Sequence, residues 1–483
     1  MRCVMGHVKQ VTPPQGNPDH RPDNRSPTRI LIVGGGCVGM YAALRLQRRL
    51  HRGEAEVTLV EPQPYMTYQP FLAEAAAGAI DPRNVIVPLR RVLRNCTVIT
   101  GEVTEVEHAT HRARAATPAT RTDGGPDLEL PYDLLVAAPG SISRTLPVPG
   151  LADHGIGFKT VEEAVGLRNH VLEQLDIASS TRDPAIRQAA LTFVFVGGGY
   201  AGVEALAELE DMARYATRYY HNVAPDDLRW VLVEATDRIL PEVGPELGRY
   251  TVFELRSRNI EVRLGTRLES VVDRVVVLSD GSRFAARTLV WTAGVRPAPV
   301  LAGTDLPRDS RGRIRCEPTL QVVGVDGVWS AGDCAAVPDL TRPGEYCAPN
   351  AQHAVRQAKV LGDNVLAHLR GTPQTPYRHA YAGSVASLGL HKGVAQIHGH
   401  RFTGRPAWLM HRAYHLSRMP TFNRKARILA DWLLAGISAR EIVSLGSLEH
   451  PRAEFEAAMG REQQAQRKPP EPPPSSGSQP SRG

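Results

Sequence analysis

Two sets of glycines in this chain have the spacing with which a backbone loop encloses a pyrophosphate. The sets are Gly34, Gly36 and Gly39, and Gly197, Gly199 and Gly202. Both match G-x-G-x-x-G, in which the first glycine allows a tight turn and the second lets the backbone approach the phosphates. The third lets a helix pack on the preceding strand, and that helix points its positive dipole end at the phosphates. The sequence therefore predicts two dinucleotide-binding loops.

An acidic residue lies beyond each loop, where a carboxylate can accept a hydrogen bond from a ribose 2′-hydroxyl. Glu61 follows the predicted strand Val57–Val60, and Glu234 follows the predicted strand Trp230–Val233. A carboxylate at the second position repels a 2′-phosphate, so Glu234 favours NADH over NADPH. Arg238 is close by in the sequence and would weaken that preference.

The segments around both loops have the pattern of strand–helix–strand units. Apolar strands are predicted at Ile30–Val33 and Leu191–Val196, and a helix follows the first loop at Met40–Leu50. Continuous apolar runs of this length are typical of strands buried on both faces of a parallel sheet. We therefore predict an α/β fold with two Rossmann-like dinucleotide-binding domains, the second inserted in the first.

The expected domain boundaries follow from the order of these units. The first domain is predicted at 29–151 and 293–383, the second at 152–292, and a C-terminal helical region at 384–461. The polar, proline-containing ends 1–28 and 462–483 are expected to be a disordered extension and a disordered tail.

Several connecting segments are assigned only from their local pattern. The segments Val98–Val106 and Leu128–Val136 are predicted as strands that border an exposed loop at Ala109–Asp127. Gly155–Ala190 is predicted to be helical, and Leu268–Val277 to be a strand. The small residues at the end of Tyr132–Gly140 predict a turn at which the backbone approaches a nucleotide.

Composition limits the class of protein. A chain of 483 residues is long enough for two or three domains, and its net charge of +7 suggests only a mild preference for anionic partners. The six cysteines include no C-x-x-C pair and no zinc-like spacing, so we expect reduced thiols and no metal site. No apolar run approaches the ~18 residues of a membrane span, and we expect no nucleic-acid partner.

The segment Arg401–Ala430 combines seven basic residues with interleaved apolar ones and contains no Asp or Glu. Pro420 divides it into two predicted helices. One interpretation is a pair of basic amphipathic helices on an anionic membrane surface. The other is a helical pair packed on the protein's own body, where it would serve a homodimer.

Taken together, these motifs resemble the two-dinucleotide-binding-domain flavoproteins related to disulfide reductases, and within them the type II NADH dehydrogenases. These are single-subunit NADH:quinone oxidoreductases. The resemblance covers about Arg29 to His450 and rests on the two glycine sets and on five further segments. Those segments are TAGVRP at Thr292–Pro297, AGD at Ala331–Asp333, YMTYQPFLAEAAAG from Tyr65, AQHAVRQA at Ala351–Ala358, and the basic Trp-containing C-terminus.

The resemblance implies an enzyme that passes a hydride from NADH to FAD and two electrons on to a membrane quinone, without proton pumping. It implies that FAD contacts Gly34, Gly36, Gly39, Glu61, Tyr68, Gln69, Pro70, Gly140, Gly294, Gly332 and Asp333, and that NADH contacts Gly197, Gly199, Gly202 and Glu234. Asp333 would hydrogen-bond the ribityl chain, and Tyr68, Gln69 and Pro70 would lie by the isoalloxazine. Gln352 and His353 would lie near the quinone headgroup, and Lys392 would face the flavin or the quinone.

Glu204, on the first turn after the second loop, has two interpretations. In the family the matching glutamate lies close to the nicotinamide and the flavin, which implies a catalytic role in proton transfer or nucleotide orientation. Alternatively, an acid at a helix N-terminus complements the dipole and contributes roughly 0.3–1 kcal/mol. The resemblance also implies a peripheral location on the inner, cytoplasmic face of the cell membrane. His411, Arg412, His415 and Arg418 make the first predicted helix less apolar than is usual for the family anchor.

Other enzymes and proteins with this pair of nucleotide sites stay open as alternatives. A sulfide:quinone oxidoreductase needs a redox cysteine pair at the flavin, and this chain has no cysteine between Cys96 and Cys316. Disulfide reductases need such a pair beside the first helix. A soluble ferredoxin or rubredoxin reductase, or a flavoprotein redox sensor without turnover, would use the same two nucleotide loops.

Overall fold

The computed structural model describes residues 26–379, 383–446 and 456. Its first sheet has five parallel strands in the order β21-β9-β1-β2-β5. The strands are β1 (Thr28–Val33), β2 (Ala55–Glu61), β5 (Thr97–Thr100), β9 (Leu134–Ala137) and β21 (Val328–Ser330). The apolar central strands are buried, as expected of a parallel sheet covered on both faces.

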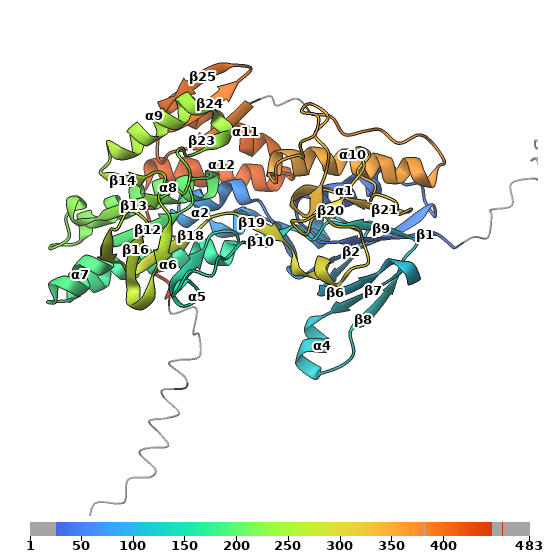
Figure 1. Cartoon of the computed structure of the whole chain (residues 1–483), viewed down its shortest axis with the longest axis horizontal. Helices are drawn as coiled ribbons and strands as arrows, with labels where there is room; N and C mark the ends of the chain where they lie inside the picture. Colours follow the sequence, from blue (N-terminus) through green and yellow to red (C-terminus); the bar gives the residue numbers. More distant parts are fainter. Residues whose placement is uncertain (1–25, 380–382, 447–455, 457–483) are drawn as a thin grey trace, which may run out of the picture.

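A second five-stranded parallel sheet has the order β11-β18-β12-β13-β14. Its strands are β11 (Gly155–Gly157), β12 (Thr192–Val196), β13 (Arg229–Val233), β14 (Ile260–Arg263) and β18 (Thr288–Trp291). All of them lie between β9 and β21 in the chain, so the second unit is inserted in the first. The two units form the two ends of the elongated molecule in Figure 1, and the predicted fold class is confirmed.

Helices cover both sheets. In the first unit, α1 (Cys37–Arg49) packs against α10 (Ala351–Leu369). In the second unit, α6 (Val161–Ser180), α7 (Pro184–Ala190), α8 (Tyr200–Ala216) and α9 (Pro245–Arg256) surround the sheet, and the short helix α2 (Leu72–Ala76) of the first unit contacts α6 and α8. A capping box of Thr160 and Glu163 starts α6, and the Asn350 side chain caps α10.

The remaining elements are short. They are β3 (Tyr65–Thr67), β4 (Ile86–Pro88), α3 (Leu89–Val92), β10 (Ser141–Ser143), α5 (Leu151–His154), β15 (Leu268–Ser270), β16 (Val275–Leu278), β17 (Arg283–Ala285), β19 (Val295–Pro297), β20 (Ile314–Arg315) and β22 (Ala335–Ala336). The antiparallel pair β10–β19 joins the two units. A tight turn at Asp280-Gly281 connects β16 to β17.

The predicted loop at Ala109–Asp127 is wrong. It contains β7 (Arg112–Ala116) and α4 (Pro118–Asp123), and β7 is the centre of a three-stranded antiparallel sheet with β6 (Glu102–Glu107) and β8 (Leu128–Pro131). Ala113 and Ala115 are buried while Arg112 and Arg114 are exposed. The alternation is real, but alanine is a poor strand former, so the pattern did not indicate a strand.

Three other segments are more divided than their patterns indicated. Val98–Val106 separates into β5 and β6, and Leu128–Val136 into β8 and β9. Gly155–Ala190 begins with the strand β11 before its two helices, so its prediction as wholly helical is wrong. Leu268–Val277 is interrupted by a turn in which Asp273 and Arg274 have φ of 52° and 61°, values that no strand allows.

The C-terminal region begins with the antiparallel strands β23 (Gly383–Ser387), β24 (Gly393–Ile397) and β25 (His400–Thr403). Two helices follow, α11 (Gly404–Arg418) and α12 (Phe422–Ile437), and the predicted break at Pro420 is confirmed. The helix α11 packs on β23 and β24, and α12 packs on the turn Pro82–Asn84. Within the described part of the chain, no helix has the length and hydropathy needed to cross a bilayer. The predicted tail at 462–483 and nearly all of the predicted extension at 1–28 lie outside the described residues.

Candidate active site

The first glycine loop has one open position between two crowded ones. Gly34 has φ of +97°, and a Cβ there would lie 2.2 Å from the Ala138 carbonyl oxygen. A Cβ at Gly39 would lie 1.8 Å from the Gly34 carbonyl oxygen, so both positions require glycine. A Cβ at Gly36 would meet nothing within 4 Å. Because α1 starts at Gly36 without a side-chain cap, its first N–H groups face a space in which a pyrophosphate fits.

The second loop repeats this geometry. Gly197 has φ of +117° and is crowded by Thr292, and a Cβ at Gly202 would lie 2.0 Å from the Gly197 carbonyl oxygen. Gly199 is again open, and α8 starts there without a side-chain cap. The chain therefore contains two equivalent places for a dinucleotide.

The two predicted ribose acids lie against their loops. Glu61 Oε2 accepts a hydrogen bond from the Gly35 N–H at 2.6 Å, and Glu234 Oε2 accepts one from the Gly198 N–H at 2.6 Å. Burial raises the pKa of the Glu61 carboxyl, although hydrogen bonds from Gly35 and Gln63 oppose the shift. Each carboxylate thus sits at the end of its strand, where the sequence predicted it.

Asp333 is joined to a lysine that sequence reasoning missed. The Ser141 hydroxyl donates to Asp333 Oδ2 at 2.6 Å, and Lys159 Nζ donates to the same hydroxyl at 2.7 Å. Gln69 Nε2 donates to the Lys159 carbonyl at 3.3 Å, which connects the predicted isoalloxazine loop to Asp333. Burial lowers the pKa of Lys159, and the Asp333 charge opposes this shift. Lys159 directly precedes the capping box that starts α6. This capping box is the one local sequence signal that fixes the position of Lys159.

The predicted small-residue turns lie where the two units meet. Gly140 has φ of +72° and Gly294 has φ of +94°, and a Cβ at either would meet nothing within 4 Å. They flank the β10–β19 pair. Gly332 has φ of +76°, and its N–H donates to Gln357 Oε1 at 2.8 Å. Gln357 belongs to the AQHAVRQA segment but was not singled out from the sequence.

Tyr68 and Pro70 lie beneath the C-terminal helix α11. The Tyr68 hydroxyl donates to the His415 carbonyl at 3.2 Å, and the two rings meet edge to face. Burial raises the pKa of Tyr68 and keeps it a neutral donor. Pro70 starts the single 3₁₀ turn Gln69–Phe71 that holds this loop in shape.

Glu204 belongs to a cluster of three buried carboxylates. Glu204 and Glu208 lie on α8, and Glu74 lies on α2. Glu204 Oε1 accepts from the Ser387 N–H at 2.9 Å, and Glu208 Oε1 accepts from the Ser387 hydroxyl at 2.8 Å. Burial and the nearby Glu74 and Asp211 charges raise the pKa of Glu208 to about 7. A purely dipole-complementing acid would be exposed, and Glu204 is not.

Two side chains of α11 supply the opposite charge. Arg412 Nη2 donates to Glu74 Oε2 at 2.9 Å, and its guanidinium lies over the rings of Trp408 and Trp432. His411 Nε2 lies 3.3 Å from Glu204 Oε1, close enough for an ion pair when the imidazole is protonated. Burial opposes the charged form, but the carboxylates of Glu204, Glu74 and Glu208 raise the pKa of His411.

Gln352 and His353 point to different surroundings at the start of α10. Gln352 Nε2 donates to the Gly383 carbonyl at 3.1 Å, while its buried Oε1 has no hydrogen-bond partner among the described residues. His353 Nδ1 lies 2.9 Å from the Tyr377 hydroxyl, and burial lowers its pKa. The structure therefore brings His353 to Tyr377 and not to Glu204.

Comparisons with known proteins agree with this geometry. The family model described as pyridine nucleotide-disulphide oxidoreductase matches residues 28–358. The chain belongs to this family. It is 29% identical over 444 residues to the type II NADH:quinone oxidoreductase Ndh of Mycobacterium tuberculosis, covering 88% of this chain and 91% of the relative. It is 28% identical over 393 residues to the type II NADH:quinone oxidoreductase of Staphylococcus saprophyticus, covering 79% of this chain and 92% of the relative.

A solved structure shows the same fold. NDH2 from Plasmodium falciparum, in complex with NADH, superimposes with a TM-score of 0.78 at 17% identity, covering 87% of this chain and all of that chain. The insertion of one nucleotide-binding unit in another is thus the arrangement of this pyridine nucleotide-disulphide oxidoreductase.

Lys392 is not brought to the loops of this family member. Its Nζ lies 2.9 Å from Glu254 Oε1 on α9. The turn that carries it rests on the C-terminal half of α8, where Asp211 accepts from the Leu390 N–H. No contact among the described residues supports the prediction that Lys392 faces the flavin or the quinone, and it stays a prediction.

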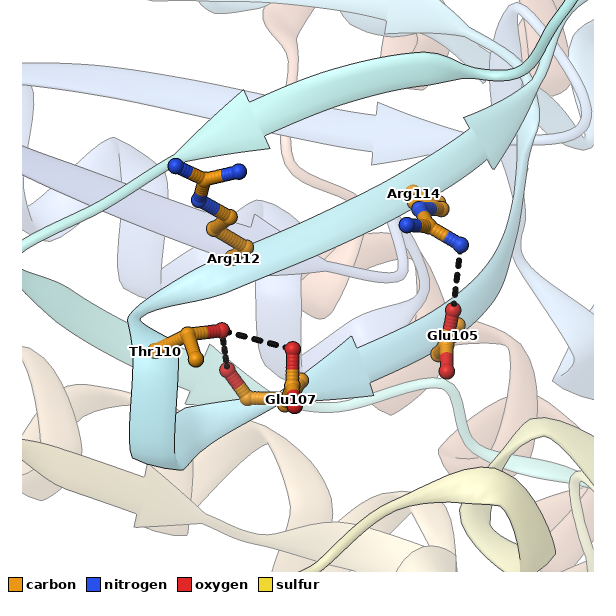
Figure 2. A pocket seen from close by; sticks show the side chains of 5 residues that line it. All are labelled: Glu105, Glu107, Thr110, Arg112 and Arg114. Carbon is orange, nitrogen blue, oxygen red and sulfur yellow. Dashed lines mark hydrogen bonds and ion pairs between the residues drawn. The ribbon is translucent and has the colours of Figure 1, made fainter.

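A hollow on the surface of the β6–β7–β8 sheet lies outside this site. Its volume is about 400 Å³, and it is lined by Glu105, Glu107, Thr110, Arg112 and Arg114. Figure 2 shows these exposed side chains, with Arg114 paired to Glu105 and Thr110 bonded to Glu107. The charges are matched within the hollow, so it offers no unbalanced group to a ligand.

The raised pKa values of Glu208 and His411 predict how stability depends on pH. Both groups bind a proton more tightly in the folded than in the unfolded chain, so each contributes stability that is lost as pH rises, for Glu208 between about 4.5 and about 7 and for His411 from about 6.5 upward. Glu208→Gln should remove one titrating group and reduce that slope by up to about 1.4 kcal/mol per pH unit. Chemical denaturation at several pH values measures this slope for the wild type, for Glu208→Gln and for the exposed control Glu56→Gln. An identical slope in all three would contradict the assignment.

Proposed function

We propose that the protein is an NADH:quinone oxidoreductase that uses FAD and pumps no protons. The observation that carries this proposal is the pair of equivalent glycine loops, each with an open second glycine, an uncapped helix and a half-buried acid. One loop suits a resident cofactor and the other a nucleotide that arrives and leaves. The relatives named type II NADH:quinone oxidoreductases support this assignment over most of their length.

The residues of the first unit fit FAD. The open Gly36 accommodates the pyrophosphate, Glu61 is placed for the ribose, and Asp333 with Ser141 and Lys159 offers donors and an acceptor for the polar chain of the cofactor. Bound FAD supplies the chemistry of accepting a hydride and releasing two electrons, and the chain supplies binding and orientation. Gln69 reaches the same group through the Lys159 carbonyl.

The second unit fits NADH. Gly199 leaves room for the pyrophosphate, and Glu234 faces the loop with one oxygen on the Gly198 N–H and the other on the Thr236 N–H. A carboxylate so placed disfavours a 2′-phosphate, so NADH is the preferred donor.

Quinone reduction consumes two electrons and two protons. The described residues offer a polar group that can bind the quinone and a buried group that can hold a proton. The buried Gln352 Oε1 lacks a partner among the described residues and suits a hydroxyl donor such as a hydroquinone. His353 is close in sequence but is held by Tyr377. The carboxylates of Glu204 and Glu208 and the imidazole of His411 form a buried group in which Glu208 has a pKa of about 7, and this group can hold the proton that NADH does not supply.

The helix α12 supports attachment to a membrane surface. Its side chains Phe422, Leu433, Leu434 and Ile437 are exposed to 85%, 64%, 57% and 84%. Such a row of apolar side chains is unusual on a protein surface that faces only water. Arg424, Lys425 and Arg427 on the same helix add positive charge, the combination that binds an anionic surface. We place the protein on the inner face of the cell membrane, as a peripheral protein.

Rapid-reaction spectroscopy of the FAD-loaded protein tests the function. NADH should bleach the flavin absorbance much faster than NADPH, and ubiquinone or menaquinone analogues should restore it. Failure of every quinone, together with turnover on ferredoxin or rubredoxin, would instead identify a soluble reductase. Absence of turnover with any acceptor would identify a redox sensor.

Glu204→Gln tests the proton-holding role. The amide keeps the size of the side chain and its acceptor for Ser387 but cannot take up a proton. We expect turnover with a soluble quinone to fall by roughly 10²-fold with an unchanged melting temperature, because proton transfer contributes about 10²–10⁴-fold. The exposed Glu56→Gln serves as control, and wild-type kinetics in Glu204→Gln would contradict the role.

Leu433→Ser combined with Leu434→Ser tests membrane attachment. Both side chains are exposed, so the fold should not change, while sedimentation with anionic vesicles should weaken by on the order of tenfold or more. Phe253→Ser on α9 is a matched control, because Phe253 is 69% exposed on another helix. Equal binding of all three proteins would show that α12 does not carry the attachment.

A further inference from the structure

A cavity of about 290 Å³ lies between α1, α3 and the start of α12. It is lined by Leu44, Gln47, Arg48, Pro88, Arg91, Val92, Arg94, Pro420, Thr421, Asn423 and Arg424. Four of these residues are arginines and none is acidic. The cavity is thus strongly positive, in contrast to the charge-matched hollow of Figure 2.

The four arginines are not neutralised by carboxylates that line the cavity. Among the described residues, no ion pair involves Arg48, Arg91, Arg94 or Arg424. Arg424 donates only to the Asn84 side chain, and Asp81 is the nearest acid that acts on it. Burial and the nearby Arg427 and Arg91 lower the pKa of Arg424, as expected where like charges are held together.

Hydrogen bonds that do not involve the arginine side chains hold the walls of the cavity in place. Gln47 Nε2 donates to the Val92 carbonyl at 2.9 Å, and Gln47 Oε1 accepts from the Asn95 N–H at 3.3 Å. Thr421 caps α12, whose first turn is part of the wall. A helix N-terminus and guanidinium groups that face one space are complementary to a phosphate group.

The cavity is separate from the nucleotide loops. It contacts α1 at Leu44, Gln47 and Arg48, at the end opposite to Gly36. With a rise of about 1.5 Å per residue, Gln47 lies roughly 15 Å along α1 from its first turn. The pyrophosphate of a bound dinucleotide therefore does not reach the arginines.

We propose that this cavity binds the headgroup phosphate of an anionic phospholipid. The proposal rests on the membrane attachment argued above and specifies its lipid. The start of α12 lines the cavity, and the adjoining Phe422 is almost fully exposed, so a phosphate bound there leaves the acyl chains beside an apolar helix. Basic pockets next to membrane-facing helices recognise anionic headgroups in this way. A free phosphate ion would gain nothing from the apolar neighbours.

The test uses the full-length, FAD-loaded protein and its Arg91→Gln/Arg94→Gln variant. Binding is measured to phosphatidylcholine vesicles with and without phosphatidylglycerol. The wild type should prefer the phosphatidylglycerol vesicles, and the double variant should lose about fivefold in affinity for each removed arginine on those vesicles only. The exposed pair Arg283→Gln/Arg311→Gln makes the same charge change elsewhere and should keep the preference.

Three results would overturn the proposal. The first is an equal phosphatidylglycerol preference in the wild type and the Arg91/Arg94 variant. The second is loss of that preference in the Arg283/Arg311 control as well, which would indicate general charge attraction. The third is binding of inorganic phosphate, measured by calorimetry, that displaces the protein from vesicles at constant ionic strength, which would indicate a free-phosphate site.

The vesicle-binding result can be distinguished from the result of the quinone-turnover test of the proposed function. Turnover of NADH with a soluble quinone should be the same in the Arg91/Arg94 variant and the wild type, since no residue that lines the cavity belongs to either glycine loop. If the protein shows no quinone turnover, vesicle selectivity is still measured directly. If Leu433→Ser/Leu434→Ser abolishes binding to both kinds of vesicle while the arginine variant loses only selectivity, attachment and headgroup recognition are distinct.

Discussion

The burial of three carboxylates between α2, α8 and α11 is the constraint on which the assembled site depends. Uncompensated, such charges are costly to remove from water. Arg412 and His411 of α11 supply the compensation, and Trp432 of α12 donates to Glu74 at 2.7 Å. The C-terminal helices are therefore bound to both nucleotide-binding units at one point, and their position is fixed by charge as well as by packing.

The same cluster gives Glu204 a structural role. A carboxylate held by the Ser387 N–H and facing His411 is part of the contact between α8 and the C-terminal region. Because Glu208 titrates near neutral pH in these surroundings, the cluster can change its proton content without opening. Any shift in the proton content of the site is thus coupled to the attachment of α11.

The sequence correctly predicted the features that depend on short-range patterns. The glycine loops, the acids Glu61 and Glu234, and the break at Pro420 depend on residues within one strand–helix–strand unit or one turn, and the structure places them as expected. Lys159 and Gln357 were missed because neither belongs to a recognisable local motif, although their partners Ser141 and Gly332 lie only 18 and 25 residues away. His411 was missed because it meets Glu204, which lies in a distant part of the chain. The strand β7 was missed for another reason, since its buried alternate positions are alanines.

Of the two interpretations of the C-terminal helices, packing on the body holds for α11, while attachment of α12 to a membrane surface stays a proposal. Both helices are basic and amphipathic, so their patterns alone could not separate them. In the structure α11 turns His411 and Trp408 inward, whereas α12 buries Ile428 and leaves most of its apolar side chains exposed. Of the polar residues that made α11 unlike an ordinary anchor, His411 and Arg412 meet the buried carboxylates, and His415 meets Tyr68. Charged residues within α11 therefore indicated an internal partner, and the exposed apolar side chains of α12 are what support the proposed contact with lipid.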